Sequence, residues 1–162
     1  MEEPCPLSNP QLDFSLRLIE YTREKMRTLV TGLRHEQLFK IPQGFHNNIL
    51  WNFGHVLVAQ QVLCYKMSGL PLRIPSYVPA FFGKGTRPSE WTGTIDPAEV
   101  LGWHAETMTF LREDLENHRF KTYEPYTPSI GVELHNIGEA LIHVAFHDAL
   151  HFGIMMSQRK LV

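Results

Sequence analysis

The stretch His143-Val-Ala-Phe-His147-Asp-Ala-Leu-His151 places three histidines at strict four-residue spacing near the C-terminus. In an α-helix, residues four apart lie on the same face, one turn above the other. Two imidazoles at that spacing can bind one metal ion if a third ligand comes from a facing helix. His55, far upstream in another stretch of helical character, can supply that ligand. The pattern therefore predicts a helix bundle with a metal site.

The spacing alone does not choose the ligand set. A catalytic divalent metal typically takes three protein ligands and keeps a position open, and imidazole nitrogens suit zinc, nickel or iron. His55, His147 and His151 would supply such a set, but His143 with His147 is an equally good pair, and Asp148 with His151 is another. The sequence lacks the paired Glu-x-x-His motifs of di-iron carboxylate bundles, so we exclude a ferritin-like site.

Capping signals divide the chain into four helical stretches. Asparagine or aspartate precedes each of them, and proline takes the first helical position of two. No alternating strand pattern lies between them, so we expect an all-α fold, a four-helix bundle, in a single domain over residues 1–162. Residues 1–8 are expected to form a disordered tail. The stretches are 10–32 after Asn9, 49–68 after Asn48, 97–117 after Asp96, and 137–160 after Asn136.

Apolar residues support the first and last of these helices. In the last, the histidine row shares its stripe with the core-like residues Ala140, Val144 and Met155, and histidines on such a face are costly to bury unless they are paired or ligating. In the first, the apolar residues at helical intervals are Phe14, Leu18, Tyr21, Leu29 and Leu33.

Two irregular segments, 69–95 and 120–135, separate the later helices. The first is rich in proline and glycine and interleaved with Tyr77, Phe81, Phe82 and Trp91, so it cannot be one helix. We expect this long loop, between the second and third helices, to act as a lid over a site, as a cover for apolar surface, or as both. Gly54 costs helix propensity, which indicates a close approach of another helix beside His55.

Composition limits the remaining function classes. A formal charge of −2 with no basic stripe argues against nucleic-acid binding. No apolar run reaches the roughly 18 residues of a membrane span, so we expect no membrane partner and a soluble, cytoplasmic protein. Cys5 and Cys64 are expected to be free thiols, because two cysteines in these contexts do not indicate a disulfide framework.

Two segments together resemble the DinB/YfiT-like superfamily: Asn48-Ile-Leu-Trp51-Asn-Phe-Gly-His55, and His147-Asp-Ala-Leu-His151-Phe-Gly153. Members of that superfamily are four-helix bundles in which one histidine of the second helix and a His-x-x-x-His pair of the last hold a metal. The resemblance implies His55, His147 and His151 as ligands of one divalent metal ion. Many members continue His-Arg-Gly-Gln after the last ligand, whereas this chain has His151-Phe152-Gly153-Ile154.

The resemblance also implies a function. We expect an enzyme that uses the metal to activate a low-molecular-weight thiol for transfer to an electrophilic substrate held under the 69–95 loop, with no protein nucleophile. The alternatives are a metal-dependent hydrolase that uses metal-bound water, and a non-catalytic bundle that binds a metal or ligand. Homodimers are common in the superfamily, so the resemblance implies a homodimer.

Three further residues are candidates for the surroundings of the metal. Trp51 lies one turn before His55. His143 is either a proton carrier beside the site or a buried partner of a backbone or hydroxyl group, and we favour the buried partner. Asp148 either orients a ligating imidazole or is a surface charge, and we favour the surface charge. The remaining histidines are expected in surface or loop positions: His35, His46, His104, His118 and His135.

Overall fold

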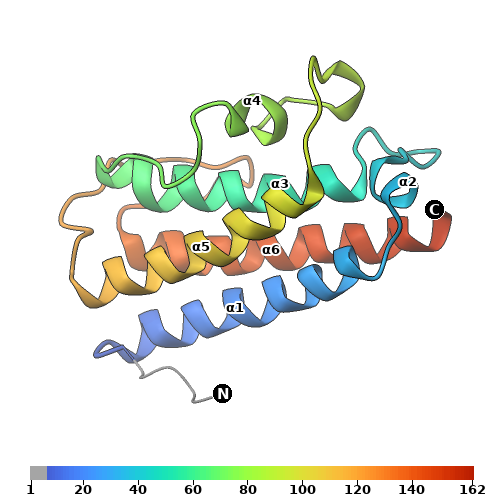
Figure 1. Cartoon of the computed structure of the whole chain (residues 1–162). Coiled ribbons are helices and arrows are strands. Elements are labelled where there is room, and N and C mark those ends of the chain that lie inside the picture. The colour runs from blue at the N-terminus through green and yellow to red at the C-terminus, as the bar shows by residue number, and fades with distance from the viewer. Residues whose placement is uncertain (1–6) are drawn as a thin grey trace.

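The computed structural model describes residues 7–162, which form helices joined by loops. Four long helices pack side by side: α1 (Pro10–Thr31), α3 (Ile49–Gln60), α5 (Pro97–Glu116) and α6 (Ile137–Gln158). α1 and α6 run in one direction, and α3 and α5 run in the other (Figure 1). Within the described residues, strand pairing is limited to one isolated bridge between Tyr126 and Leu134. The predicted all-α fold is confirmed.

The helices begin where the capping residues predict. Each capping side chain accepts a hydrogen bond from a backbone N–H of the first turn, which has no partner within its own helix. The pairs are Asn9 with Gln11 and Leu12, Asn48 with Trp51, Asp96 with Ala98, and Asn136 with Glu139.

The predicted helix over residues 49–68 is helical throughout but changes geometry along its length. α3 passes into the π-helical turn η1 (Gln61–Tyr65) and then the 3-10 turn η2 (Lys66–Ser68). Gly69 ends this run with a positive φ of 71°, a left-handed conformation that glycine adopts without strain. The short helices α2 (His35–Phe39) and α4 (Val78–Phe82) were not predicted, because five residues carry too little periodicity, and neither was the 3-10 turn η3 (Pro88–Glu90). The last predicted helix, 137–160, ends in the 3-10 turn η4 (Arg159–Leu161).

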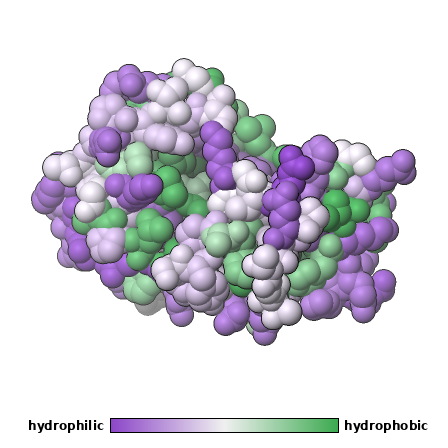
Figure 2. Space-filling model, turned by 90° about the horizontal axis from the view of Figure 1, so that it is seen from above, coloured by the Kyte–Doolittle hydropathy of each residue, from purple (hydrophilic) through white to green (hydrophobic). Residues whose placement is uncertain are grey.

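The length of the 69–95 loop follows from the helix directions. Because α3 and α5 are parallel, the chain must return along the bundle between them, and it passes over α3 through α4 on the way (Figure 1). The loop is packed against the bundle: Phe82 is fully buried, and the Trp91 indole donates to the Phe81 carbonyl oxygen at 2.9 Å. On the face seen from above, hydrophobic residues show among the hydrophilic residues that dominate its outline (Figure 2). The loop therefore covers apolar surface, which is one of the two roles expected for it.

The buried face of α1 differs from the apolar row that predicts the helix. Phe14, Leu18 and Tyr21 are exposed. Leu29 of that row is buried, and the core face also carries Leu16, Ile19, Met26 and Val30. It also carries Arg23, a polar residue in the middle of the helix, which is buried. The helix prediction was right, but its core face could not be read from the apolar spacing alone.

His104 on α5 is buried, so the expectation of a surface position was wrong. Its ring stacks on Phe53 at a centroid distance of 3.8 Å, and Nε2 donates to the Phe53 carbonyl oxygen at 2.7 Å. Burial, with the Arg23 guanidinium as the next cause, lowers the pKa of His104 to about 3. The imidazole is neutral and serves packing between α3 and α5. The other histidines in that group are exposed: His35, His46, His118 and His135.

Residues 1–6 of the expected tail, including Cys5, lie outside the described residues. Leu7 donates its backbone N–H to the Asp13 carboxylate at 3.0 Å. Cys64 is a free, fully buried thiol, and burial raises its pKa to about 12. No helix between residues 7 and 162 is long and apolar enough to cross a membrane.

Gly54 lies against the ring of Phe82. A Cβ at this position would fall well inside van der Waals contact with three ring atoms of Phe82, which is itself buried. We predict that Gly54→Ala destabilises the fold by about 1–3 kcal/mol, because the ring has no free space to move into. The matched control is Gly102→Ala in the middle of α5, where a Cβ meets nothing within 4 Å. Alanine should stabilise that site by about 0.5–1 kcal/mol. Urea unfolding of both variants checks this, and equal effects would contradict it.

Candidate metal centre

The structure brings His55 of α3 together with His147 and His151 of α6. The three offer ligand atoms that all lie within 4.8 Å of one another. Their ring centroids are 5.2 Å apart for His55 and His147, 4.8 Å for His55 and His151, and 4.5 Å for His147 and His151. His143 stays outside this group, although its ring lies 6.1 Å from that of His147. Of the sets that spacing left open, this is the one that comes together.

The outer nitrogen of His55 is held by the long loop. Nδ1 lies 2.8 Å from the Phe82 carbonyl oxygen. A carbonyl only accepts, so Nδ1 carries the proton and Nε2 keeps its lone pair. Trp51 stacks on the same imidazole, with ring centroids 4.5 Å apart and planes 9° from parallel, and its indole donates to the Thr86 hydroxyl at 2.9 Å. The ring of His55 is therefore fixed in orientation and in tautomer.

The outer nitrogen of His151 is held by a chain of amides. Nδ1 lies 2.8 Å from Oδ1 of Asn52, one helical turn before His55 on α3. The Asn52 amide nitrogen donates to the Asn48 carbonyl oxygen and to Oε1 of Gln158, and the Gln158 amide nitrogen donates to the Asn47 carbonyl oxygen. These acceptors fix which way each amide points, so Oδ1 of Asn52 accepts from His151. His151 also keeps its Nε2 lone pair.

The outer nitrogen of His147 faces Asp148. Nδ1 of His147 and Oδ1 of Asp148 are both buried without a hydrogen-bond partner, and they lie 3.9 Å apart. That separation is too long for a hydrogen bond, but the carboxylate attracts a proton on Nδ1. Asp148 is completely buried, so the favoured surface position was wrong. It is held by Arg23, whose Nε donates to Oδ2 at 2.8 Å.

Arg23 keeps the Asp148 carboxylate ionised in the core. Burial alone would raise the pKa of Asp148, but the guanidinium of Arg23, with a smaller contribution from His147, holds that pKa below its ordinary value. Arg23 also donates to Oε1 of Gln60 and to the Val56 carbonyl oxygen. An ion pair needs such further hydrogen bonds when both of its members are buried.

The donor set fits a divalent metal ion. Burial lowers the pKa of His55 to about 4 and that of His151 to about 3, so both rings are neutral and can coordinate at neutral pH. In all three rings, the outer nitrogen faces an acceptor and the other nitrogen is free. Imidazoles arranged in this way are suited to zinc, nickel or iron. Among the described histidines, cysteines and acidic residues, none joins the three as a fourth ligand.

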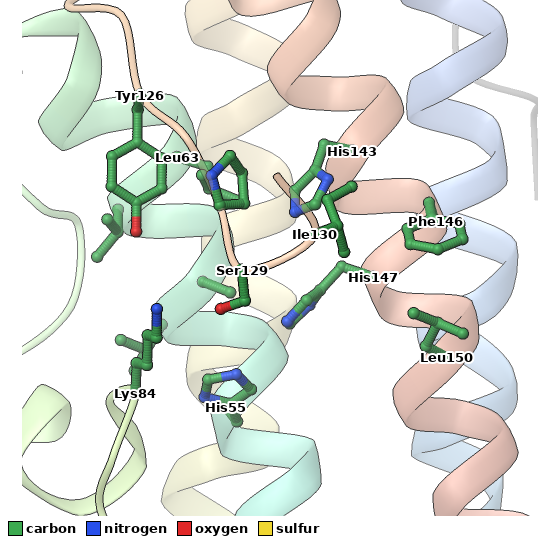
Figure 3. A pocket seen from close by; sticks show the side chains of 14 residues that line it. His55, Leu63, Lys84, Tyr126, Ser129, Ile130, His143, Phe146, His147 and Leu150 are labelled. Carbon is green, nitrogen blue, oxygen red and sulfur yellow. The ribbon is translucent and has the colours of Figure 1, made fainter. Parts of the chain in front are cut away.

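A cavity of about 170 Å³ lies beside the three histidines. His55 and His147 form part of its wall, and His143 lines it as well. Figure 3 shows Lys84, Ser129 and Tyr126 on one side of this space, and Phe146 and Leu150 along α6. His143 has no hydrogen-bonding partner among the residues that the structure describes, so the favoured backbone or hydroxyl partner is not found. Trp51 supports His55 from outside the cavity wall.

Sequence reasoning missed the groups that hold the outer nitrogens of His55 and His151, and the arginine that holds Asp148. Asn52 lies four residues after Asn48 and three residues before His55, so the three residues share one face of the helix. That spacing could have drawn attention to it. The Phe82 carbonyl and Arg23 left no signal, since a backbone oxygen is not encoded by residue type and Arg23 lies 125 positions from Asp148 in the sequence.

Comparisons with known proteins agree with the fold. Residues 18–155 match the family model of the DinB superfamily, which confirms the resemblance seen in the sequence. The structure is similar to the crystal structure of a conserved protein from Enterococcus faecalis, with a TM-score of 0.63 and 11% sequence identity over 92% of this chain and 95% of that one. At this identity the likeness shows the fold alone. No curated protein matches the chain.

We predict that the metal-free protein loses stability as the pH falls from 7 to 5. In the unfolded chain, His55, His104 and His151 bind protons near pH 6.5, whereas their folded-state pKa values are about 4, 3 and 3. The unfolded state therefore binds more protons in this window, and stability present above pH 6.5 is lost on acidification. Urea unfolding after chelator treatment checks this, and constant or rising stability toward pH 5 would contradict it.

Proposed function

This chain belongs to the DinB superfamily, and from that premise we propose that it is a metal-dependent enzyme. In this proposal His55, His147 and His151 hold one divalent metal ion, and the enzyme transfers a low-molecular-weight thiol to a small electrophilic substrate. We place it in the cytoplasm, because low-molecular-weight thiols are kept reduced there.

One observation carries the proposal more than any other. Three imidazoles converge beside a cavity, each with its outer nitrogen facing an acceptor, and no described histidine, cysteine or acidic residue adds a fourth ligand to close the site. Structural zinc sites are closed by four protein ligands, whereas catalytic sites keep a position for water or substrate. The arrangement therefore favours an enzyme over a non-catalytic metal-binding bundle.

The residues of this chain have separable roles in such a reaction. A divalent metal, when bound, supplies Lewis acidity that lowers the pKa of a thiol or water reaching it. Phe82 and Asn52 hold His55 and His151 each in one tautomer, and the Asp148 carboxylate faces the outer nitrogen of His147, so the rings are oriented in advance. The apolar cavity wall, which includes Val58, Val62 and Leu63, limits the access of water to a reacting group.

The cavity lining favours thiol transfer over hydrolysis. Metal-dependent hydrolases commonly place a carboxylate beside the metal as general base for water, as in the glutamate of the His-Glu-x-x-His motif. The cavity wall of this protein contains neither aspartate nor glutamate. A thiol needs less help, because its own pKa is far below that of water. Hydrolysis remains the second candidate.

The test uses cobalt(II) in place of the native metal, because cobalt–thiolate bonds absorb in the near ultraviolet. We expect 2-mercaptoethanol to give a saturable sulfur-to-cobalt band, and ethylene glycol, which has hydroxyl in place of thiol, to give none. The His147→Ala variant should bind no cobalt and should show no sulfur-to-cobalt band. Cobalt binding without a thiol band would reject thiol transfer and leave hydrolysis. No cobalt binding at all would reject the metal centre.

A second copy of this chain is the partner that we propose for the outer face of α6. Every fourth residue of α6 on this face is apolar, and the neighbouring helix α1 adds a further apolar row. The side chains are between 37% and 65% exposed: Ile142, Phe146, Leu150 and Ile154 on α6, Phe14, Leu18 and Tyr21 on α1, and Ile130 and Val132 in the adjacent loop.

The area of this face is what a stable dimer needs. At typical side-chain sizes, these nine residues together expose roughly 800 Å², about the contribution of one partner to a standard interface. A shallow apolar hollow of about 350 Å³, lined by Ile130, Val132, Ile142 and Phe146, can take a side chain of the partner. Phe146 also lines the cavity, so a second copy would close that side of the site.

We predict that the protein sediments at twice the chain mass and that Ile142→Glu makes it a monomer with an unchanged fold, because a carboxylate in an apolar interface is costly to desolvate. Leu161→Glu is the matched control, since Leu161 is equally exposed but lies outside this face. Analytical ultracentrifugation with circular dichroism checks both variants. A monomeric wild type, or a dimer that survives Ile142→Glu, would contradict the proposal.

A further inference from the structure

Three polar side chains meet at the cavity without any protein partner. The ammonium of Lys84 and the hydroxyls of Tyr126 and Ser129 point toward the same space (Figure 3). Within residues 7–162, none of the three makes a hydrogen bond or an ion pair with another residue. They come from two different loops, 69–95 and 120–135. Their convergence leaves three donors available to one ligand beside the metal centre.

The turn that carries Lys84 is held in place by the same residues that support His55. Phe82, two residues earlier, accepts from His55, and Gly83 donates its N–H to the Pro79 carbonyl oxygen at 2.8 Å. The hydroxyl of Thr86 lies 2.8 Å from the carbonyl oxygen of Gly83 and accepts from the indole of Trp51. The backbone on both sides of Lys84 is therefore fixed relative to His55, although the side chain itself is exposed.

The second loop is also held at the cavity. Tyr126 and Leu134 exchange both backbone hydrogen bonds, at 3.1 and 2.8 Å, which pairs the two arms of the segment. Between them, Gly131 donates to the Pro128 carbonyl oxygen at 2.9 Å and has a positive φ of 80°, which forms a tight turn. Ser129 lies in this turn. The two hydroxyls are thus carried by a defined backbone rather than by a free loop.

The charge and the size of the cavity define what can bind. Lys84 is the one lysine or arginine in its wall, which contains no aspartate or glutamate, and most of the remaining wall is apolar. An ammonium with two hydroxyls complements a single negative charge. A cavity of about 150 Å³ holds one benzene molecule, so the 170 Å³ here suits a body of a single ring or a short branched chain.

We propose that Lys84, Tyr126 and Ser129 form a subsite for the carboxylate of the substrate, and that this substrate is a small monocarboxylic acid with an apolar body. This acid would be the electrophile of the proposed thiol transfer, so the inference rests on the proposed function. A carboxylate held by Lys84 places the apolar body against Val58, Val62 and Leu63, beside the histidines. At this subsite a phosphate dianion is a poorer match, because Lys84 alone would leave one of its charges uncompensated there.

The test measures binding of benzoate to the full chain by ligand-observed NMR titration, first on metal-free protein and then on the zinc-loaded form. Benzamide is the neutral probe of the same shape. We expect metal-free wild type to bind benzoate about fivefold more tightly than benzamide, a modest factor because Lys84 is exposed. Lys84→Gln should bring the two affinities together. Lys160→Gln, at an exposed lysine in η4, should leave the preference unchanged.

The outcomes separate this inference from the metal centre. Because the first titration contains no metal, the preference for benzoate can hold even if the histidines bind no ion, and it can fail when zinc binds normally. Equal binding of benzoate and benzamide, binding of neither, or a preference that survives Lys84→Gln would overturn the carboxylate subsite. Displacement of benzoate by inorganic phosphate at equal concentration would overturn it in favour of phosphate ligands.

Discussion

The buried ion pair between Arg23 and Asp148 joins the helices of the bundle to the candidate metal centre. Arg23 of α1 binds the Asp148 carboxylate of α6 and the Val56 carbonyl of α3, and it lies 3.5 Å from the Met108 sulfur of α5. Removing one member of such a pair typically costs about 3–5 kcal/mol, because the other charge is left uncompensated. Asp148 follows His147 directly, so the carboxylate that ties α6 to α1 also faces the outer nitrogen of a ligand. Helix packing and ligand orientation therefore depend on one interaction.

At the other two histidines, contacts that pack the fold likewise orient a candidate ligand. The loop that covers α3 supplies the carbonyl that fixes His55, and the close approach that this loop needs is made at Gly54, where no side chain intervenes. The amides that fix His151 run from Asn52 through Gln158 to the backbone before α3. The contacts of α3 with the loop and with α6 therefore orient His55 and His151, as the pairing of α1 with α6 does for His147.

Local rules made much of this predictable from the sequence. Capping residues such as Asn48 and Asn136 placed the helix starts, four-residue spacing proposed the histidine row, and the family resemblance selected His147 and His151 within it. Contacts between distant segments were not predictable, because no local pattern encodes them. Asp148 and His104 were expected at the surface since their partners, Arg23 and Phe53, lie far away in the sequence. The exposed row of Phe14, Leu18 and Tyr21 has the spacing of a core face, and only the packed structure distinguishes the two.

In our proposal, three imidazoles hold one divalent metal through Nε2, with at least one position open to the cavity. A crystal structure of the zinc-loaded protein, with anomalous diffraction recorded at the zinc absorption edge, tests it most directly. We expect one anomalous peak about 2.0–2.1 Å from Nε2 of His55, His147 and His151, with no fourth protein ligand. A peak bound through Nδ1, a site closed by a fourth side chain, or no peak among these histidines would contradict it.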